Sequence, residues 1–154
     1  MSADVTARPL TVATWNVHGG VGRDRHYSPA RIADVVLETG ADVIALQEVG
    51  SKDASEVLLD ALVGGTGFAA VDGWTCRRGG CDFGNVVLSR FPIAAARRLD
   101  LTVHGREPRG ALDVVASTPQ GALRVIGTHL GLWPGERRAQ VRKLLGALAS
   151  EAPL

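Results

Sequence analysis

The chain has 154 residues, a net charge of +1 and 45% hydrophobic residues, the proportions expected of one folded domain. This composition argues against intrinsic disorder, and no apolar run reaches the roughly 20 residues of a membrane-spanning helix. The near-neutral charge gives no support to a large non-specific nucleic-acid footprint. The first residues, Met1 to Val5, carry no secretory signal pattern, so we expect a cytoplasmic protein.

The only cysteines in the sequence are Cys76 and Cys81. Two thiols cannot complete a structural zinc site. A disulfide between them is conceivable, but a cytoplasmic chain would keep it reduced, so we expect free thiols.

The first half of the chain alternates strand and helix signals. Residues 11–17 and 42–49 predict strands because they are rich in apolar and β-branched residues. Ser28-Pro29 predicts a helix start, with serine as the N-cap, and Gly40 predicts its end. A second helix is expected from about Ser55 through Leu62, stopped by Gly64-Gly65.

The second half predicts a run of short strands and one final helix. The strands are expected over residues 68–71, 85–89, 95–103, 111–116 and 123–130. The helix follows Trp133-Pro134-Gly135, and its apolar residues recur with the spacing of an amphipathic helix, namely Val141, Leu144, Leu145 and Leu148. Sheets packed together with helices outside, a layered α/β architecture, fit this order.

Common catalytic motifs are absent, and polar residues at strand ends remain. The sequence has no Gly-Lys-Ser/Thr phosphate loop, no zinc-protease histidine pair and no Gly-x-Ser-x-Gly elbow. Asn16 closes the first apolar strand and Glu48 the second. Alternation places Glu48 on one face with Ile44 and Leu46, at the rim of a core, where a divalent metal would offset its charge. On spacing alone, an exposed glutamate in a turn is the commoner interpretation.

Three further polar residues lie in or beside strand signals. His129 shares a face with Leu123 and Val125, and a lone histidine there is more often structural than catalytic. Asn85 precedes an apolar run and Arg109 lies in Glu-Pro-Arg-Gly. Taken singly, each is more typical of a turn or a surface.

Taken together, these segments resemble the endonuclease/exonuclease/phosphatase superfamily, which has the deoxyribonuclease I-like fold. The resemblance rests on stretches in the family's order over nearly the whole chain: Thr14-Trp15-Asn16-Val17-His18-Gly19, Ala45-Leu46-Gln47-Glu48-Val49, Gly84-Asn85 through Pro92-Ile93, Glu107-Pro108-Arg109-Gly110, and Thr128-His129-Leu130. It implies a four-layer α/β/β/α sandwich.

The resemblance also implies roles for these residues. Glu48 matches the chief Mg²⁺ carboxylate, with Mn²⁺ as a second candidate ion, and Asn16 matches a position that contacts the metal or the phosphate. His129 matches a residue that contacts the scissile phosphate, and Asn85 and Arg109 match substrate-binding positions at the rim. The implied chemistry is metal-assisted attack of water on phosphorus.

The sequence departs from the family pattern after His129. Only residues 130–154 follow, and they contain neither the Gly-Asp-x-Asn strand end nor the terminal Asp-His pair. We therefore expect residues 1–154 to be a truncated domain, inactive as it stands, which a C-terminal segment or a partner chain would complete. The alternative is a non-catalytic module that binds Mg²⁺ or phosphate.

The substrate class stays open at this stage. The resemblance implies a phosphate ester, which could be nucleic acid, an inositol phosphate or a phospholipid head group. Two arginine pairs are candidates to line a phosphate groove, Arg77-Arg78 and Arg137-Arg138.

Overall fold

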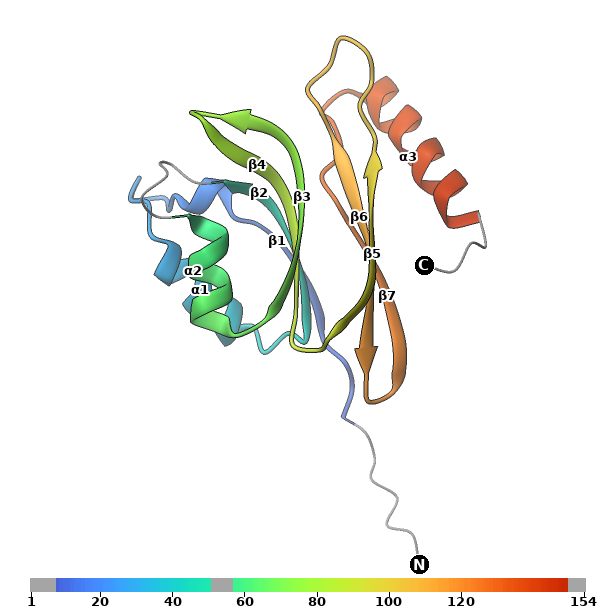
Figure 1. Ribbon diagram of the computed structural model, residues 1–154. Coiled ribbons are helices and arrows are strands. Elements are labelled where there is room, and N and C mark those ends of the chain that lie inside the picture. Colours follow the sequence, from blue (N-terminus) through green and yellow to red (C-terminus); the bar gives the residue numbers. More distant parts are fainter. Residues whose placement is uncertain (1–7, 51–56, 150–154) are drawn as a thin grey trace, which may run out of the picture.

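The computed structural model describes residues 8–50 and 57–149. Its elements form four layers (Figure 1). Helices α1 (Pro29–Glu38) and α2 (Leu58–Thr66) cover one sheet, a second sheet packs on the other face of the first, and α3 (Pro134–Ala149) lies outside the second sheet. This arrangement confirms the predicted α/β/β/α sandwich.

The first sheet has the strand order β1-β2-β4-β3. Strands β1 (Val12–Asn16) and β2 (Val43–Gly50) are parallel neighbours, connected through α1. Strands β3 (Ala69–Arg78) and β4 (Cys81–Ser89) form a hairpin, and β4 pairs antiparallel with β2. The parallel pair ends at Asn16 and Gln47, which are register partners, so the predicted site residues Asn16 and Glu48 lie at the same end of the two strands.

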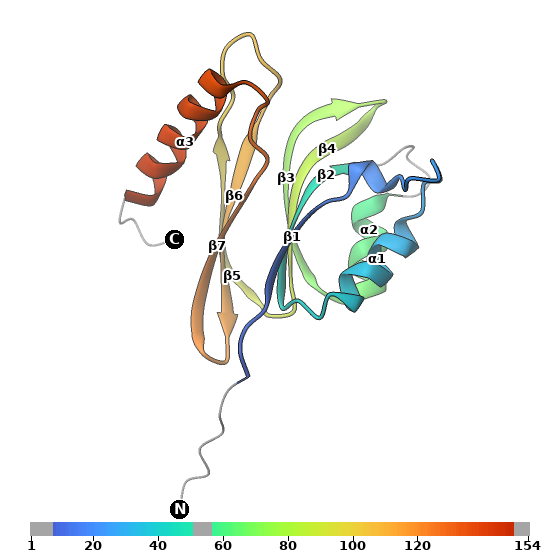
Figure 2. The ribbon, with the colours of Figure 1, turned by 180° about the vertical axis from the view of Figure 1, so that it is seen from behind.

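The second sheet is an antiparallel meander in the order β5-β6-β7. Its strands are β5 (Ile93–Asp100), β6 (Gly110–Thr118) and β7 (Gly121–Thr128). Strands β1 and β7 are edge strands of their sheets, and the view from behind shows them on the same side of the sandwich (Figure 2). Val12 of β1 remains 50% exposed there, although its register partner Val43 is buried.

Two apolar clusters hold the layers together. One lies between the first sheet and its helices and includes Leu46, Leu58 and Leu88. The other lies between the two sheets and includes Val43, Val87 and Leu112. Burial of such side chains contributes roughly 1.5–3 kcal/mol each, so these clusters fix the register on which the site depends.

The first helices begin and end for identifiable reasons. The Ser28 hydroxyl accepts a hydrogen bond from the Arg31 backbone N–H at 3.4 Å, which confirms the predicted N-cap. The predicted stop of the second helix at Gly64-Gly65 is wrong, because α2 continues through both glycines to Thr66. The left-handed residue that ends it is Gly67, with φ of 70°. The predicted start at Ser55 lies outside the described residues.

Helix α3 forms as predicted but buries a different face. Its predicted apolar stripe is largely exposed, with Leu145 at 59% and Leu148 at 45%. The residues it buries are the polar Glu136 and Gln140. Within the described residues, no helix is long and apolar enough to cross a membrane.

The strands differ from prediction mainly at their ends. The hairpin strands β3 and β4 extend to Arg78 and from Cys81, well past the apolar runs that predicted them. Strand β5 ends at Asp100, so residues 101–103 belong to the following loop and not to the strand.

Candidate functional site

A β-bulge in β2 sets the direction of Glu48. Leu46 pairs with Val86 and Val49 pairs with Gly84, so two residues of β2 stand opposite the single residue Asn85. Glu48 takes φ of +56° in this bulge, a left-handed conformation that a residue with a Cβ rarely adopts. Backbone strain of this kind clusters at functional sites.

The predicted face of Glu48 is wrong, because the prediction did not include the bulge. Strict alternation places Glu48 with Ile44 and Leu46, but those two side chains belong to the cluster beneath the helices. Glu48 instead lines a pocket together with Asn85 and His129. Alternation failed because the bulge breaks the two-residue period at this point.

Asn16 and His18 hold the Glu48 carboxylate. The Asn16 side-chain Nδ2 donates to Glu48 Oε1 at 2.8 Å, and His18 Nδ1 lies 3.5 Å from Oε2. Asn16 is itself fixed, because its Oδ1 accepts a hydrogen bond from the His18 backbone N–H at 3.0 Å. Burial by itself would raise the pKa of Glu48, but the Asn16 hydrogen bond and the nearby histidines outweigh it and lower that pKa below its usual value. The carboxylate is therefore ionised at neutral pH.

His129 and Arg109 form the opposite wall. Arg109 Nη1 lies 3.4 Å from His129 Nδ1, and His129 Nδ1 lies 3.9 Å from Glu48 Oε1. Burial lowers the pKa of His129, and the positive charge of Arg109 lowers it further, while Glu48 opposes them. A guanidinium can only donate, so Nδ1 is the acceptor and the neutral ring carries its proton on Nε2.

The predicted site residues therefore meet in one place. Glu48, Asn85, Arg109 and His129 line a single small pocket of about 10 Å³, room for one water molecule. Asn16 joins them through its hydrogen bond to Glu48. Asn85 is buried and its Nδ2 donates to the Gly110 carbonyl at 3.0 Å, so it also anchors the start of β6 beside Arg109.

Close backbone packing places Asn85. A Cβ on the preceding Gly84 would lie 2.3 Å from the Gly73 carbonyl oxygen and 2.9 Å from the Trp74 Cα. Both atoms belong to the backbone of β3, so only glycine lets β3 and β4 approach this closely. The approach coincides with a second bulge, in β3 between Trp74 and Cys76.

Sequence reasoning missed several residues around the pocket. His18 lay within a family motif but had no predicted role, and Thr75 gave no signal at all. Glu107 Oε2 accepts from Arg109 Nη2 at 2.9 Å, and Glu107 also forms an ion pair with Arg78. Of the four arginines considered for a phosphate groove, Arg78 is thus linked to the site, whereas Arg77 lies within 3.6 Å of Asp82. Arg137 donates to the Leu132 carbonyl.

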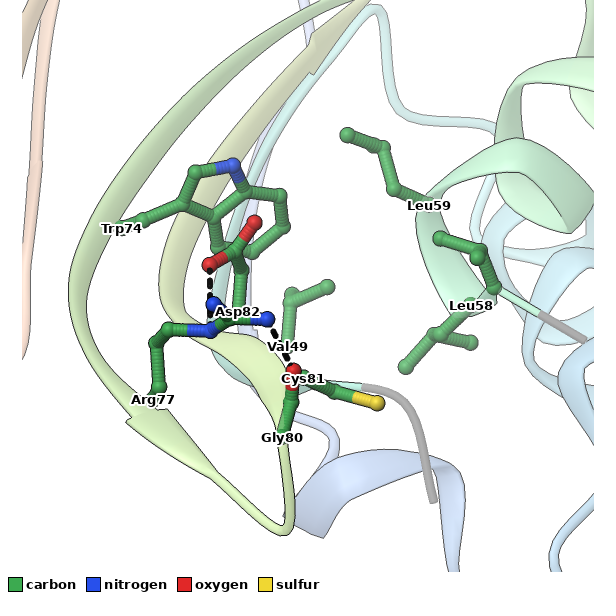
Figure 3. Close-up of a pocket in the computed structure, with 10 residues that line it drawn as sticks. Val49, Leu58, Leu59, Trp74, Arg77, Gly80, Cys81 and Asp82 are labelled. Carbon is green, nitrogen blue, oxygen red and sulfur yellow. Dashed lines mark hydrogen bonds and ion pairs between the residues drawn. The ribbon is translucent and has the colours of Figure 1, made fainter. Parts of the chain in front are cut away.

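A separate pocket lies on the helix side of the first sheet. It has a volume of about 180 Å³ between α2 and the tip of the β3–β4 hairpin (Figure 3). Figure 3 shows the Cys81 sulfur on the side facing Leu58, with Arg77 turned toward Asp82 and Gly80. Both cysteines are free, as predicted, and this pocket contains none of the predicted site residues.

Comparison with known proteins defines the class of this chain. A model of the Endonuclease/Exonuclease/phosphatase family matches residues 13–153, so the chain belongs to that family. It is 31% identical over 146 residues to the uncharacterized protein YbhP of Escherichia coli strain K12, an alignment that covers 86% of this chain and 58% of YbhP. The chain thus spans somewhat more than half the length of this curated relative.

Solved structures agree on the fold. An endonuclease/exonuclease/phosphatase from Beutenbergia cavernae DSM 12333 is similar with a TM-score of 0.75 and 26% identity, covering 89% of this chain and 43% of that one. D. rerio TDP2, solved with a single-strand DNA product, is similar with a TM-score of 0.69 and 21% identity, covering 94% and 56%.

Proposed function

We propose that this chain carries the metal- and phosphate-binding half of a divalent-metal-dependent phosphoester hydrolase. The observation that carries the proposal is the meeting of an ionised carboxylate, a guanidinium and a neutral imidazole in one pocket at the mouth of the sandwich. Family membership supports the same chemistry.

The donors around Glu48 fit Mg²⁺, with Mn²⁺ as the second candidate. Mg²⁺ is usually held by one or two carboxylates together with water and substrate phosphate. Within residues 8–50 and 57–149 no group of three or more His, Cys, Asp or Glu side chains could form a full protein cage. Glu48 would hold the ion, with Asn16 beside it. Because the protein offers no full cage there, water and substrate phosphate would complete the coordination. The ion would supply charge stabilisation at the phosphoryl oxygens.

The remaining residues bind and orient the phosphate. The Nε2–H of His129 is available to donate to a phosphoryl oxygen, because Nδ1 is occupied by Arg109. Arg109 offers a fixed cation, since Glu107 and His129 hold its guanidinium on two sides and its side chain is 11% exposed. Asn16 is a positioning residue for the Glu48 carboxylate.

The group that activates water is not found in this pocket. Glu48 is the only carboxylate among the described residues that line it. We therefore keep the prediction that the chain as given has little turnover, and we keep the alternative of a non-catalytic module that binds Mg²⁺ or phosphate. A phosphate ester is the proposed ligand in both cases, and a C-terminal segment or a partner chain is the proposed source of the missing group. The site residues and the cytoplasmic location also remain predictions.

Titration calorimetry with orthophosphate tests the site. We expect binding that requires MgCl₂, is lost in Glu48→Ala and is weakened in Arg109→Gln. Absence of phosphate binding in the unaltered chain would refute the hydrolase, and absence of Mg²⁺ binding as well would refute the module. The gene sequence beyond the Leu154 codon then separates them, because a continued frame encoding Gly-Asp-x-Asn and Asp-His favours the hydrolase and a stop codon favours the module.

A further inference from the structure

Another pocket, distinct from the one in Figure 3, adjoins the proposed phosphate site and shares Arg109 with it. The pocket has a volume of about 210 Å³ and lies between the loop that precedes β6 and the start of α3. Arg106, Leu132 and Trp133 line it together with Arg109. Arg109 also lines the Glu48–His129 pocket. A ligand whose phosphate contacts Arg109 can therefore extend into this second pocket.

The pocket presents an aromatic platform to solvent. Trp133 is 59% exposed and Leu132 is 75% exposed, high values for side chains of this size and polarity. The Arg106 guanidinium lies 5.3 Å from the centre of the Trp133 ring. Nucleobases commonly stack on aromatic side chains and on arginine guanidinium groups.

The backbone beneath the platform is held in place. The Trp133 carbonyl accepts from the Arg137 N–H at 2.9 Å, and the Leu132 carbonyl accepts from Arg137 Nη2 at 2.7 Å. The buried Gln140 side chain accepts from the Gly131 N–H at 2.8 Å. A platform held by these bonds loses little freedom when it binds a ring, which favours affinity.

We propose that the pocket of Arg106, Leu132 and Trp133 binds the base of a nucleotide-type phosphoester whose phosphate contacts Arg109. The inference rests on the proposed function and names its substrate class. The chemistry of the pocket disfavours the other classes. The lining also includes Glu107 and Glu136, but Glu107 is already paired with Arg78 and Arg109. Arg106 lies over the Trp133 ring, the place where a cationic choline head group would bind. A polyhydroxylated inositol ring has no aromatic face to stack on Trp133.

Titration calorimetry with two matched probes tests this proposal. Adenosine 5′-monophosphate and ribose 5-phosphate carry the same phosphate, and only the first has a base. With MgCl₂ present, we expect the unaltered chain to bind adenosine 5′-monophosphate about 5- to 150-fold more tightly, the range for stacking of one base. Trp133→Ala should remove that difference while leaving ribose 5-phosphate binding unchanged, and Trp133→Phe should retain most of it.

Leu145→Ala is the matched control, because Leu145 of α3 is also 59% exposed and lies outside the pocket. It should change neither affinity. Equal binding of the two probes by the unaltered chain overturns the inference, as does a Trp133→Ala variant that weakens both probes alike. If neither probe binds, the proposed function itself is overturned, and the inference with it.

Discussion

Replacing Glu48 separates the backbone strain of the bulge from the chemistry of the carboxylate. Glu48→Ala and Glu48→Gly both remove the carboxylate and leave Asn16 Nδ2 without its acceptor. They differ in one respect, because alanine keeps a Cβ at φ of +56° and glycine does not. The difference between the two variants therefore measures the strain that the bulge imposes.

The size of that difference follows from the conformation. A left-handed residue with a Cβ costs roughly 1–2 kcal/mol. Glycine loses more conformational entropy on folding than alanine does. This loss cancels about 0.5–1 kcal/mol of the stability gained by relieving the strain. The net advantage of Glu48→Gly over Glu48→Ala is about 0.5–1 kcal/mol, or a melting temperature higher by roughly 1–4 °C for a domain of this size.

Thermal unfolding followed by circular dichroism, with MgCl₂ or with EDTA, measures both the backbone strain and the binding of the metal. The unaltered chain should melt higher in MgCl₂ than in EDTA, because a ligand that binds only the folded state stabilises it. Neither Glu48 variant should show this shift. Thr14 of β1 supplies the control, since in an ordinary strand conformation Thr14→Gly should be less stable than Thr14→Ala.

Two results would refute the reasoning. If Glu48→Ala keeps the full Mg²⁺ shift, the carboxylate is not the metal ligand. If Glu48→Gly melts below Glu48→Ala, as in the Thr14 pair, the bulge stores no strain and the left-handed conformation has no energetic consequence.

Three further substitutions probe the packing of β3 against β4, the buried Asp113 and the site residue Arg109. Gly84→Ala should destabilise the fold by about 1–3 kcal/mol in a urea titration, because its Cβ would meet the backbone of β3. The hydrogen bond from Arg124, reinforced by Arg97, holds the pKa of the buried Asp113 below its usual value against the opposing effect of burial. The stability that Asp113 contributes is therefore present above pH about 4 and lost as the pH falls through its folded-state pKa, so the melting-temperature gap between the unaltered chain and Asp113→Asn should shrink from pH 7 to pH 3. Arg109→Lys should weaken phosphate binding severalfold by calorimetry although the charge is kept, because lysine cannot contact Glu107, His129 and phosphate together.

The sequence was sufficient for features that depend on local chemistry. Ser28-Pro29 specifies a helix start through one side-chain hydrogen bond and the fixed φ of proline, and the structure shows that bond with Pro29 as the first residue of α1. The identity of the family was also accessible, because its motifs keep their order along the chain.

Features that depend on two strands at once were not accessible. The face of Glu48 depends on a bulge opposite Asn85, and no residue of β2 by itself predicts this bulge. The hairpin tip was missed because Arg77, Arg78 and two glycines resemble a loop, yet Arg77 and Arg78 pair with residues 81–82 and continue both strands. The contact between Glu107 and Arg78 joins segments far apart in the sequence, so spacing could not predict it.

Helix α3 shows how a correct periodicity can support a wrong conclusion about packing. Its leucines recur at helical spacing, and an apolar stripe of that kind predicts burial. In the structure the buried contacts are polar instead: Gln140 accepts from the Gly131 N–H at 2.8 Å and donates to Glu136 at 3.1 Å. Gly131 lies two residues after His129, so these bonds fix the segment that presents the imidazole. The N-terminal half of the helix is thus attached to the segment that follows His129, and periodicity does not report this attachment.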